Sequence, residues 1–458
     1  MNSGGLSPSR SPPLNPEGVF PFKKEESVMK RIGVGLLGFG TVGGGVYKAL
    51  QSQEDVILKR TETLFEVRSI LVKEKDKERA VKGVQSLITT DFDRVLEAGV
   101  EVIVEAIGGT EPARMYVERA LEAGCHVVTA NKELMAKHGV QLERLARNRK
   151  VQILYEASVG GGIPVLGTMG HFLKANRVHR ISGILNGTTN YILTRMSREG
   201  DSFAKVLAEA QQKGYAEADP AADVDGFDAV YKLAVLCRLA FETEVPVGQI
   251  LREGIRDITP EELELARKLG YAVKLLATGE QYGEKGPVSL GVGPTLLPLS
   301  HPLAGVDGVY NAIHLEGDVV GDVTLVGRGA GEKPTASAVV EDLCNLYRLP
   351  SPRLPLSGEP LLLPAGEAGG SRFIFMSLRD REVPEPEQLC RRLEGIGLEV
   401  VEAVSAHGGV AFILRRWDPS HTSIVVTELG LELSRITSRP IQGVNLSQER
   451  QPEMEGVV

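Results

Sequence analysis

Apolar segments of strand length alternate with segments of helical length between residues 30 and 160. The segment RIGVGLLGFGTVGGGVYKAL predicts a strand, a glycine turn and a helix. EVRSILV, VEVIVEAIGG and HVVTANK predict three further strands, and EPARMYVERALEAG predicts a helix between them. Because strands that alternate with helices pair in parallel, residues 30–160 are expected to form an α/β domain with a Rossmann-type doubly wound sheet.

The pattern changes twice more towards the C-terminus. Residues 161–345 have longer helices and a glycine-punctuated sheet, which predicts an α+β domain whose last helix returns to the first domain. After a linker rich in proline and glycine (346–370), residues 371–448 follow the order strand, helix, strand, strand, helix, strand of a ferredoxin-like module, with SIVVTELGLELSRI as its second helix. Residues 1–29 and 449–458 are expected to be tails, the first of them flexible.

Length and charge narrow the class of protein. A chain of 458 residues with 42% hydrophobic content implies about two to four domains. Its net charge of −8, without a basic stripe, argues against nucleic-acid and membrane partners and favours small molecules. The four cysteines lack CxxC spacing, which fits a reducing compartment. Since neither a membrane span nor a signal peptide is evident, a cytoplasmic location is expected.

Three glycines point to a dinucleotide cofactor. Gly38, Gly40 and Gly43 follow an apolar strand and open a helix. The first allows a tight turn, the second lets the backbone approach a pyrophosphate, and the third lets helix and strand pack closely. In this context the glycines predict dinucleotide binding, although a plain glycine-rich turn has the same spacing.

The end of the second strand bears on the choice of nicotinamide cofactor. Lys73 begins a mixed charge cluster, KEKDKER, where Asp or Glu would hold a ribose hydroxyl and Lys or Arg a 2'-phosphate. The cluster favours NADP without excluding NAD. A solvated cluster at a strand end remains an equal alternative.

The segment GYAEADPAADVDGFDAVYK (214–232) carries five acids before one lysine. A calcium loop with Gly226 at its sixth position would place Ala221 first and Lys232 twelfth, where a glutamate is required, so the calcium interpretation fails. Asp228 and Lys232 share one face if a helix has begun by Asp228. Because the following sequence is apolar, Lys232 is either a buried lysine with a lowered pKa that exchanges protons or one that reaches the surface.

Lys132 is a second candidate. It closes the fourth strand in HVVTANK, at the carboxyl edge where doubly wound sheets bind their ligands. An exposed lysine at the start of a helix is the alternative interpretation.

These segments together resemble the homoserine dehydrogenase family. AQQKGYAEADPAADVDGFDAVYK matches the family signature position for position, and GLLGFGTVGGGV, VTANKELMAKHG, YEASVGGGIPVL, GILNGTTNYIL and GRGAGEKPTASAVV occur in the family's order. The resemblance covers residues 30 to about 345. It implies an oxidoreductase that interconverts L-homoserine and L-aspartate 4-semialdehyde with NAD(P), in the biosynthesis of threonine, isoleucine and methionine.

The resemblance also assigns roles. Lys232 would donate the proton, Lys132 would lie across the reacting oxygen, and Asp228 would position Lys232. The remaining substrate positions are Glu217 for the amino group, Asp223 for the hydroxyl end, Thr188 and Tyr215. The positions that would contact the cofactor are Phe39, Thr41, Val42, Lys132 and Gly331.

Further implications concern a cation, an effector and assembly. Glu156 and the carbonyls of Val159, Gly161 and Ile163 resemble a structural monovalent-cation site, with sodium expected. The second domain would be catalytic and dimerising, in a homodimer or homotetramer. The C-terminal module resembles an ACT domain, but RDREVPEPEQ lacks the glycine of the usual effector turn and VTELGLELSRI lacks a histidine after VT. L-threonine inhibition and a purely dimerising role therefore both remain open.

Two other functions remain as alternatives. Another semialdehyde-handling reductase would share the Rossmann start and a catalytic lysine, but not the spacing of Glu217, Asp223, Asp228 and Lys232. A non-catalytic, nucleotide-sensing regulator would keep the glycines and the C-terminal module, without a use for two positioned lysines.

Overall fold

The computed structural model describes residues 29–79, 81–349, 361–363, 371–378, 385–406, 408–418, 420–429 and 433–442. Nearly all of the two predicted tails, most of the predicted linker, and residues 379–384 at the predicted effector turn lie outside these ranges.

The first domain is built on a parallel six-stranded sheet. Its strand order, β3-β2-β1-β4-β5-β6, confirms the doubly wound prediction. β1 and β4 are buried on both faces, as expected of apolar runs in the middle of a parallel sheet. The strands are β1 (Lys30–Leu37), β2 (Thr63–Leu71), β3 (Ile88–Thr89), β4 (Val102–Glu105), β5 (His126–Thr129) and β6 (Ile153–Leu154).

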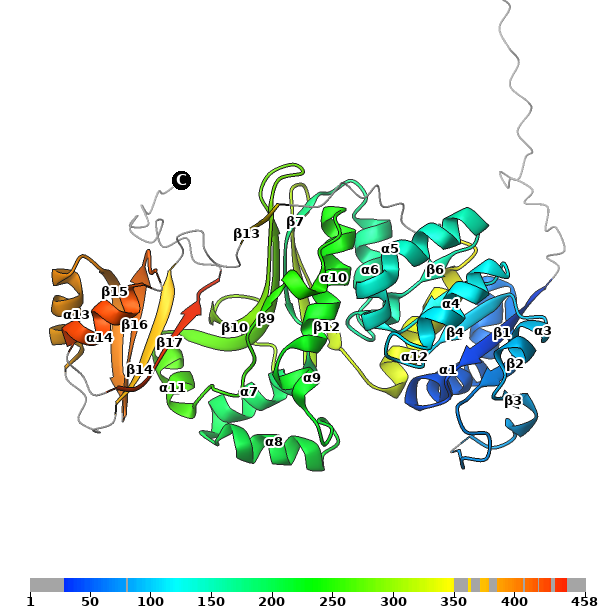
Figure 1. The fold of residues 1–458 in the computed structure, drawn as a ribbon, viewed down its shortest axis with the longest axis horizontal. Coiled ribbons are helices and arrows are strands. Elements are labelled where there is room, and N and C mark those ends of the chain that lie inside the picture. Colours follow the sequence, from blue (N-terminus) through cyan, green and yellow to red (C-terminus); the bar gives the residue numbers. More distant parts are fainter. Residues whose placement is uncertain are drawn as a thin grey trace, which may run out of the picture.

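Helices cover both faces of this sheet (Figure 1). Val46 and Leu50 of α1 pack with Val339 and Leu343 of α12 on one face, so a helix from the end of the second domain completes the core of the first. α4 and α5 pack together on the other face. The helices are α1 (Thr41–Ser52), α2 (Glu54–Thr61), α3 (Phe92–Glu97), α4 (Ala113–Glu122), α5 (Lys132–Arg149) and α12 (Glu332–Asn345).

The second domain is built on a mixed sheet of seven strands. The order is β12-β11-β7-β9-β10-β13, and β8 also pairs with β10. α7 and α10 pack against this sheet (Figure 1). The strands are β7 (Val178–Ile184), β8 (Leu251–Arg252), β9 (Tyr271–Gln281), β10 (Val288–Pro298), β11 (Tyr310–Gly317), β12 (Gly321–Arg328) and β13 (Leu362–Leu363). The helices are α6 (Val165–Gly167), α7 (Gly187–Glu199), α8 (Phe203–Gln212), α9 (Ala221–Val224), α10 (Phe227–Phe241) and α11 (Pro260–Lys268).

The C-terminal module has the ferredoxin-like order that the sequence predicts. Its antiparallel sheet runs β15-β16-β14-β17. Its elements are β14 (Arg372–Leu378), α13 (Pro386–Gly395), β15 (Glu399–Ala406), β16 (Gly409–Arg415), α14 (His421–Leu429) and β17 (Leu433–Pro440). The prediction was wrong at one boundary, because α14 ends at Leu429 and the last residues assigned to it begin β17. There the pairing of β17 with β14 supplies the hydrogen bonds that a longer helix would have made.

The two faces of this small sheet have different partners. Ile374, Met376 and Phe412 pack with the module's own helices α13 and α14. Phe373 and Phe375 point to the opposite face and join the core of the second domain, where β16 contacts α11. The module is therefore docked on the second domain by a hydrophobic contact (Figure 1).

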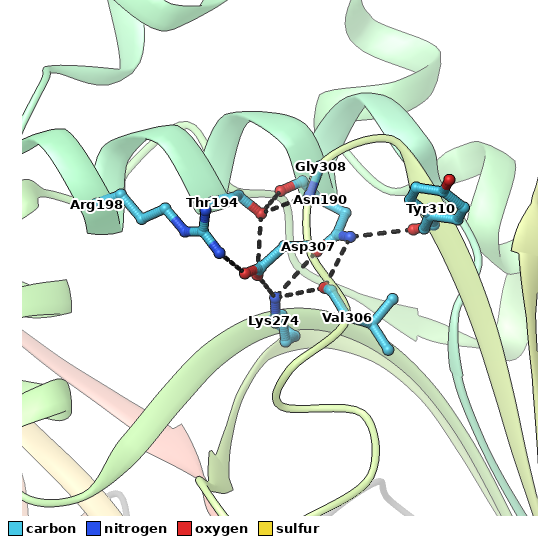
Figure 2. A network of polar contacts seen from close by, with 8 residues as sticks. All are labelled: Asn190, Thr194, Arg198, Lys274, Val306, Asp307, Gly308 and Tyr310. Atoms are coloured by element: carbon cyan, nitrogen blue, oxygen red, sulfur yellow. Dashed lines mark hydrogen bonds and ion pairs between the residues drawn. The ribbon is translucent and has the colours of Figure 1, made fainter.

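A buried lysine fixes the loop that leads into β11. Lys274, on β9, is only 3% exposed. Its ammonium donates to the carbonyl of Val306 (2.7 Å), Asp307 Oδ1 (3.0 Å) and Asn190 Oδ1 (3.3 Å), as Figure 2 shows. Three donors thus meet three acceptors, which is what a buried ammonium requires.

One face of α7 completes this network. Asn190, Thr194 and Arg198 follow one another at four-residue intervals and point to the same loop (Figure 2). Asn190 Nδ2 donates to the carbonyl of Tyr310 (3.0 Å), and Arg198 pairs with Asp307. The loop is consequently held at several points against the helix whose N-terminus reaches the candidate site.

Replacing Lys274 by methionine removes the centre of this network. Two buried acceptors and the half-buried carboxylate of Asp307 lose their shared donor, so we expect a loss of about 2 to 3 kcal/mol in unfolding free energy. Calorimetry should show a lower Tm. The control is Lys268→Met, which removes only an exposed pair with Glu264 and should change stability by less than about 0.5 kcal/mol. Equal Tm values for the two variants would contradict the role of Lys274.

Candidate active site

A cavity of about 540 Å³ lies where the second domain meets the first. Its walls come from the N-terminus of α5, the N-terminus of α7, the acidic segment that leads into α10, and the turn between β12 and α12. It brings together all of the residues that the sequence predicts for catalysis and substrate binding, namely Lys132, Thr188, Tyr215, Glu217, Asp223, Asp228 and Lys232.

A buried ion pair forms the floor of this cavity. Gly226 adopts a left-handed conformation (φ 82°) directly before α10, so Asp228 lies in the helix's first turn and Lys232 one turn later. Lys232 Nζ is 2.7 Å from Asp228 Oδ2 and donates to the carbonyl of Leu185 at 2.6 Å. Lys232 is only 6% exposed, so it is the buried lysine, not one that reaches the surface.

Lys132 reaches the same carboxylate from the first domain. It is the first residue of α5, whose N-cap, Asn131, accepts from the amide of Leu134. Lys132 Nζ is 2.5 Å from Asp228 Oδ1, and 42% of its side chain is exposed. Lys132 is thus both the helix-starting lysine and a site residue, and the two lysines bind opposite oxygens of one acid.

The charges of this cluster shift its pKa values in different directions. Burial alone would raise the pKa of Asp228, but Lys232 and Lys132 hold it well below its usual range. Burial lowers the pKa of Lys232, and Asp228 offsets only part of this effect. Burial also lowers the pKa of Lys132, but Asp228 outweighs it and the net pKa is raised. Lys232 is therefore the stronger acid of the two lysines.

Asn186 joins this cluster to Asp223. Its Nδ2 donates to Asp223 Oδ1 (2.7 Å) and Asp228 Oδ2 (3.0 Å), while its Oδ1 caps α7 by accepting from the amide of Thr189. Burial raises the pKa of Asp223, which the hydrogen bond from Asn186 opposes. The sequence predicted this position only as part of a turn and helix cap in NGTTN. No local sequence pattern indicated its contacts with two acids that lie 37 and 42 residues away in the chain.

The remaining predicted substrate positions lie around the cavity. The Thr188 hydroxyl is 2.7 Å from the carbonyl of Tyr215 and 3.1 Å from Asp223 Oδ2. The side chains of Tyr215 and Glu217 are exposed, which leaves the Glu217 carboxylate accessible to a ligand. The walls also include Asn311, a residue that the sequence did not single out.

A second cavity, of about 980 Å³, lies over the glycine turn of the first domain. Gly38 has φ 91°, and a Cβ at Gly43 would lie 2.1 Å from the carbonyl oxygen of Gly38, so both glycines are required where they stand. The predicted cofactor residues on its wall are Gly38, Phe39, Gly40, Thr41 and Lys73. Val42 and Gly331 line the first cavity instead, beside the lysines.

The predicted cation residues lie close together, but the carboxylate of Glu156 has other partners. Its two oxygens accept from the amides of Leu166 (2.9 Å) and Gly167 (2.5 Å), and burial raises its pKa to about 7. The carbonyl of Ile163 accepts from Val165. These hydrogen bonds leave lone pairs on both carboxylate oxygens, so a monovalent-cation site at Glu156, Val159, Gly161 and Ile163 stays a prediction. Among the residues that the structure describes, no group of three or more His, Cys, Asp or Glu side chains is placed to hold a metal.

The first cavity is suited to proton transfer between a lysine side chain and a bound ligand. It offers a buried ammonium of lowered pKa, a second ammonium from the other domain, and acids on the opposite wall.

No helix in the described ranges is long and apolar enough to cross a bilayer.

Sequence profiles match the two domains separately. The profile described as "Homoserine dehydrogenase, NAD binding domain" matches residues 38–156, and the one described as "Homoserine dehydrogenase" matches residues 164–344. Among curated proteins, the homoserine dehydrogenase of Bacillus subtilis is 42% identical over 340 residues, which cover 74% of this chain and 78% of that protein. The one from Synechocystis is 44% identical over 318 residues, 68% of this chain and 72% of that protein.

Solved structures agree with these sequence matches. A homoserine dehydrogenase from Thiobacillus denitrificans covers 90% of this chain and 99% of its own, with 33% identity and a TM-score of 0.78. A hyperthermophilic archaeal homoserine dehydrogenase in complex with NADPH covers 70% of this chain and 100% of its own, with 26% identity and a TM-score of 0.58. This chain belongs to the homoserine dehydrogenase family.

Proposed function

We propose that this NAD(P)-dependent oxidoreductase interconverts L-aspartate 4-semialdehyde and L-homoserine with Lys232 as the general acid. The observation that carries the proposal is the Lys232–Asp228–Lys132 cluster in the cavity between the domains. The bound nicotinamide supplies or accepts the hydride. In the reducing direction, Lys232 Nζ gives its proton to the aldehyde oxygen as the oxygen gains charge, and Asp228 holds Lys232 in place.

Lys232 suits this role better than Lys132 because burial lowers its pKa. An ammonium whose pKa lies closer to neutrality gives up its proton more readily. Lys132, with a raised pKa, stays charged and stabilises the developing negative oxygen. Two lysines gathered on one acid have no evident use in a nucleotide-sensing regulator, so no observation favours that alternative.

The other groups of the cavity would bind the two ends of the amino-acid substrate. The exposed Glu217 carboxylate suits the ammonium, and Asp223 suits the hydroxyl end next to the lysines. The N-terminus of α7, with Thr188 in its first turn, suits the substrate carboxylate. Tyr215 would contribute through its carbonyl group, beside Thr188.

We propose NADP as the preferred cofactor. Lys73 lies two residues after β2 on the wall of the nucleotide cavity, together with Lys77 and Arg79 and with the acids Glu74 and Glu78. Three cations near the expected 2'-phosphate favour NADP over NAD. The archaeal relative crystallised in complex with NADPH is consistent with this choice.

Four further proposals follow from the family. A monovalent cation such as sodium would be held by Glu156 and the backbone carbonyls of Val159, Gly161 and Ile163, and no step of the reaction depends on it. L-threonine would act at the C-terminal module. The assembly would be a homodimer or homotetramer through the second domain. The enzyme would act in the cytoplasm in threonine, methionine and isoleucine biosynthesis, and Cys125, Cys237, Cys344 and Cys390 form no disulfide, as a reducing compartment requires.

Lys232→Ala tests the general acid. We expect kcat for NADPH-dependent reduction of L-aspartate 4-semialdehyde to fall by about a hundredfold or more, the scale of a lost proton donor. Lys137→Ala, which removes an exposed lysine paired with Glu133 on α5, should leave kcat unchanged. An unimpaired kcat in Lys232→Ala would reject the role.

Lys73→Ala tests the cofactor preference. Losing one charge-assisted contact to the 2'-phosphate should raise KM for NADPH by about tenfold and leave KM for NADH unchanged. Lys59→Ala, an exposed lysine on α2 outside the cavity, is the control. An equal rise in KM for NADPH and for NADH would show that Lys73 does not contact the 2'-phosphate.

Titration with L-threonine tests the effector. We expect millimolar L-threonine to inhibit the reductive reaction and D-threonine to have no effect, because a specific site discriminates between the enantiomers of its ligand. The readout is the rate of NADPH consumption at fixed substrate. Absence of inhibition at millimolar L-threonine would leave the C-terminal module with a purely structural role.

A further inference from the structure

We propose that Arg439 of the C-terminal module is a positioning residue for the substrate site. It would act through residues 251–258, the connecting segment, which lies between the module and the acidic segment that carries Asp223. The inference rests on the proposed role of Asp223 as a substrate contact. It assigns to this module an influence on substrate affinity that requires no bound effector.

Arg439 ties the module to the second domain by a buried ionic contact. It lies near the end of β17 and is only 1% exposed. Its Nε donates to Glu262 Oε1 (2.8 Å), at the start of α11, and its Nη1 pairs with Glu253 of the connecting segment. Thr437, from the same strand, lies 3.2 Å from Glu262 Oε1. A buried guanidinium must keep its acids close, because an unpaired buried charge is strongly unfavourable.

Two neighbouring contacts make this junction stiff. Arg435 Nη1 donates to the carbonyl of Asp257, so β17 holds the connecting segment near both ends. Gln442, two residues after β17, donates its backbone amide to the carbonyl of Leu296 (3.0 Å) and its side-chain amide to the hydroxyl of Ser182 on β7. The hydrophobic face of the module packs beside these contacts on the second domain.

On its other side, the connecting segment binds the acidic segment through ion pairs and hydrogen bonds. Arg256 forms a two-pronged pair with Asp225, with Nε 2.5 Å from Oδ1 and Nη2 3.1 Å from Oδ2. Arg252 Nη1 donates to the carbonyl of Asp225 at 2.8 Å, and the amide of Ile255 donates to the carbonyl of Val224 at 2.9 Å. A Cβ at Gly254 would lie 2.5 Å from that same carbonyl oxygen, so the two segments are as close as backbones allow.

Val224 and Asp225 stand between the two acids of the active site. Asp223 directly precedes them, and Asp228 follows at the start of α10. Because Asp223 is attached to a backbone that the connecting segment holds, the position of its carboxylate depends on that segment and hence on Arg439. A displacement of about 1 Å at a substrate contact has a large effect on an enzyme.

This arrangement predicts a specific kinetic effect. Arg439→Met should raise KM for L-aspartate 4-semialdehyde by about tenfold, because one substrate contact is misplaced. The value of kcat should change much less, since Lys232 and Asp228 are held within α10, and KM for NADPH should stay the same. Arg439→Lys keeps the charge and should recover part of the affinity. Arg415→Met, in the same module on β16, is the matched control and should leave KM unchanged.

Glu253→Gln keeps the test decisive if Arg439→Met does not fold. Glu253 has a 58% exposed side chain, so its replacement threatens folding less, and it should raise KM in the same direction by about threefold. In a double-mutant cycle with Arg256→Met, the effects of Glu253→Gln on KM should be non-additive, because both residues act through one segment.

Two results would overturn the inference. One is that folded Arg439→Met and Glu253→Gln proteins have wild-type KM values. The other is that the effects of Glu253→Gln and Arg256→Met simply add. Both results differ from failure of the proposed function, which would appear as full kcat in Lys232→Ala or as normal KM in Asp223→Asn.

Discussion

The carboxylate of Asp228 holds together groups that no single domain supplies. Lys232 comes from the same helix, Lys132 from the first domain, and Asn186 from the start of α7. A buried acid is stable only with such partners, and two ammonium groups at this distance tolerate each other only because the acid lies between them. One side chain thus links both domains at the cavity and shifts the pKa values of the two lysines.

Much of the fold and part of the site could be predicted from local sequence. The alternation of strands and helices gave the parallel sheet, and the four-residue spacing of Asp228 and Lys232 gave their shared face, since both are properties of neighbouring residues. The partners of Asn186 and the ionic contact of Arg439 with Glu262 lie far apart in the chain. The hydrophobic periodicity of a segment does not indicate such contacts, because they form only when complete helices and strands pack against one another.

Two residues show why site predictions need the structure. Asp225 is one of the five acids of residues 214–232, and its carboxylate is bound by Arg256 outside the cavity. Glu156 was predicted as one of four cation ligands, and in the structure both its carboxylate oxygens accept hydrogen bonds from backbone amides of the segment that follows. In both cases the residue type indicated that the side chain would need a polar partner. Only the structure shows which group that partner is.

The return of α12 to the first domain has a consequence for how the chain is divided. The backbone passes from the first domain to the second after β6, returns before α12, and has reached the second domain again by β13; the return supplies Val339 and Leu343 to the core around α1. The nucleotide domain is therefore discontinuous in sequence. A fragment ending at residue 160 would expose the apolar side chains of α1 that α12 covers, whereas a chain that joins α12 directly to β6 would keep them covered.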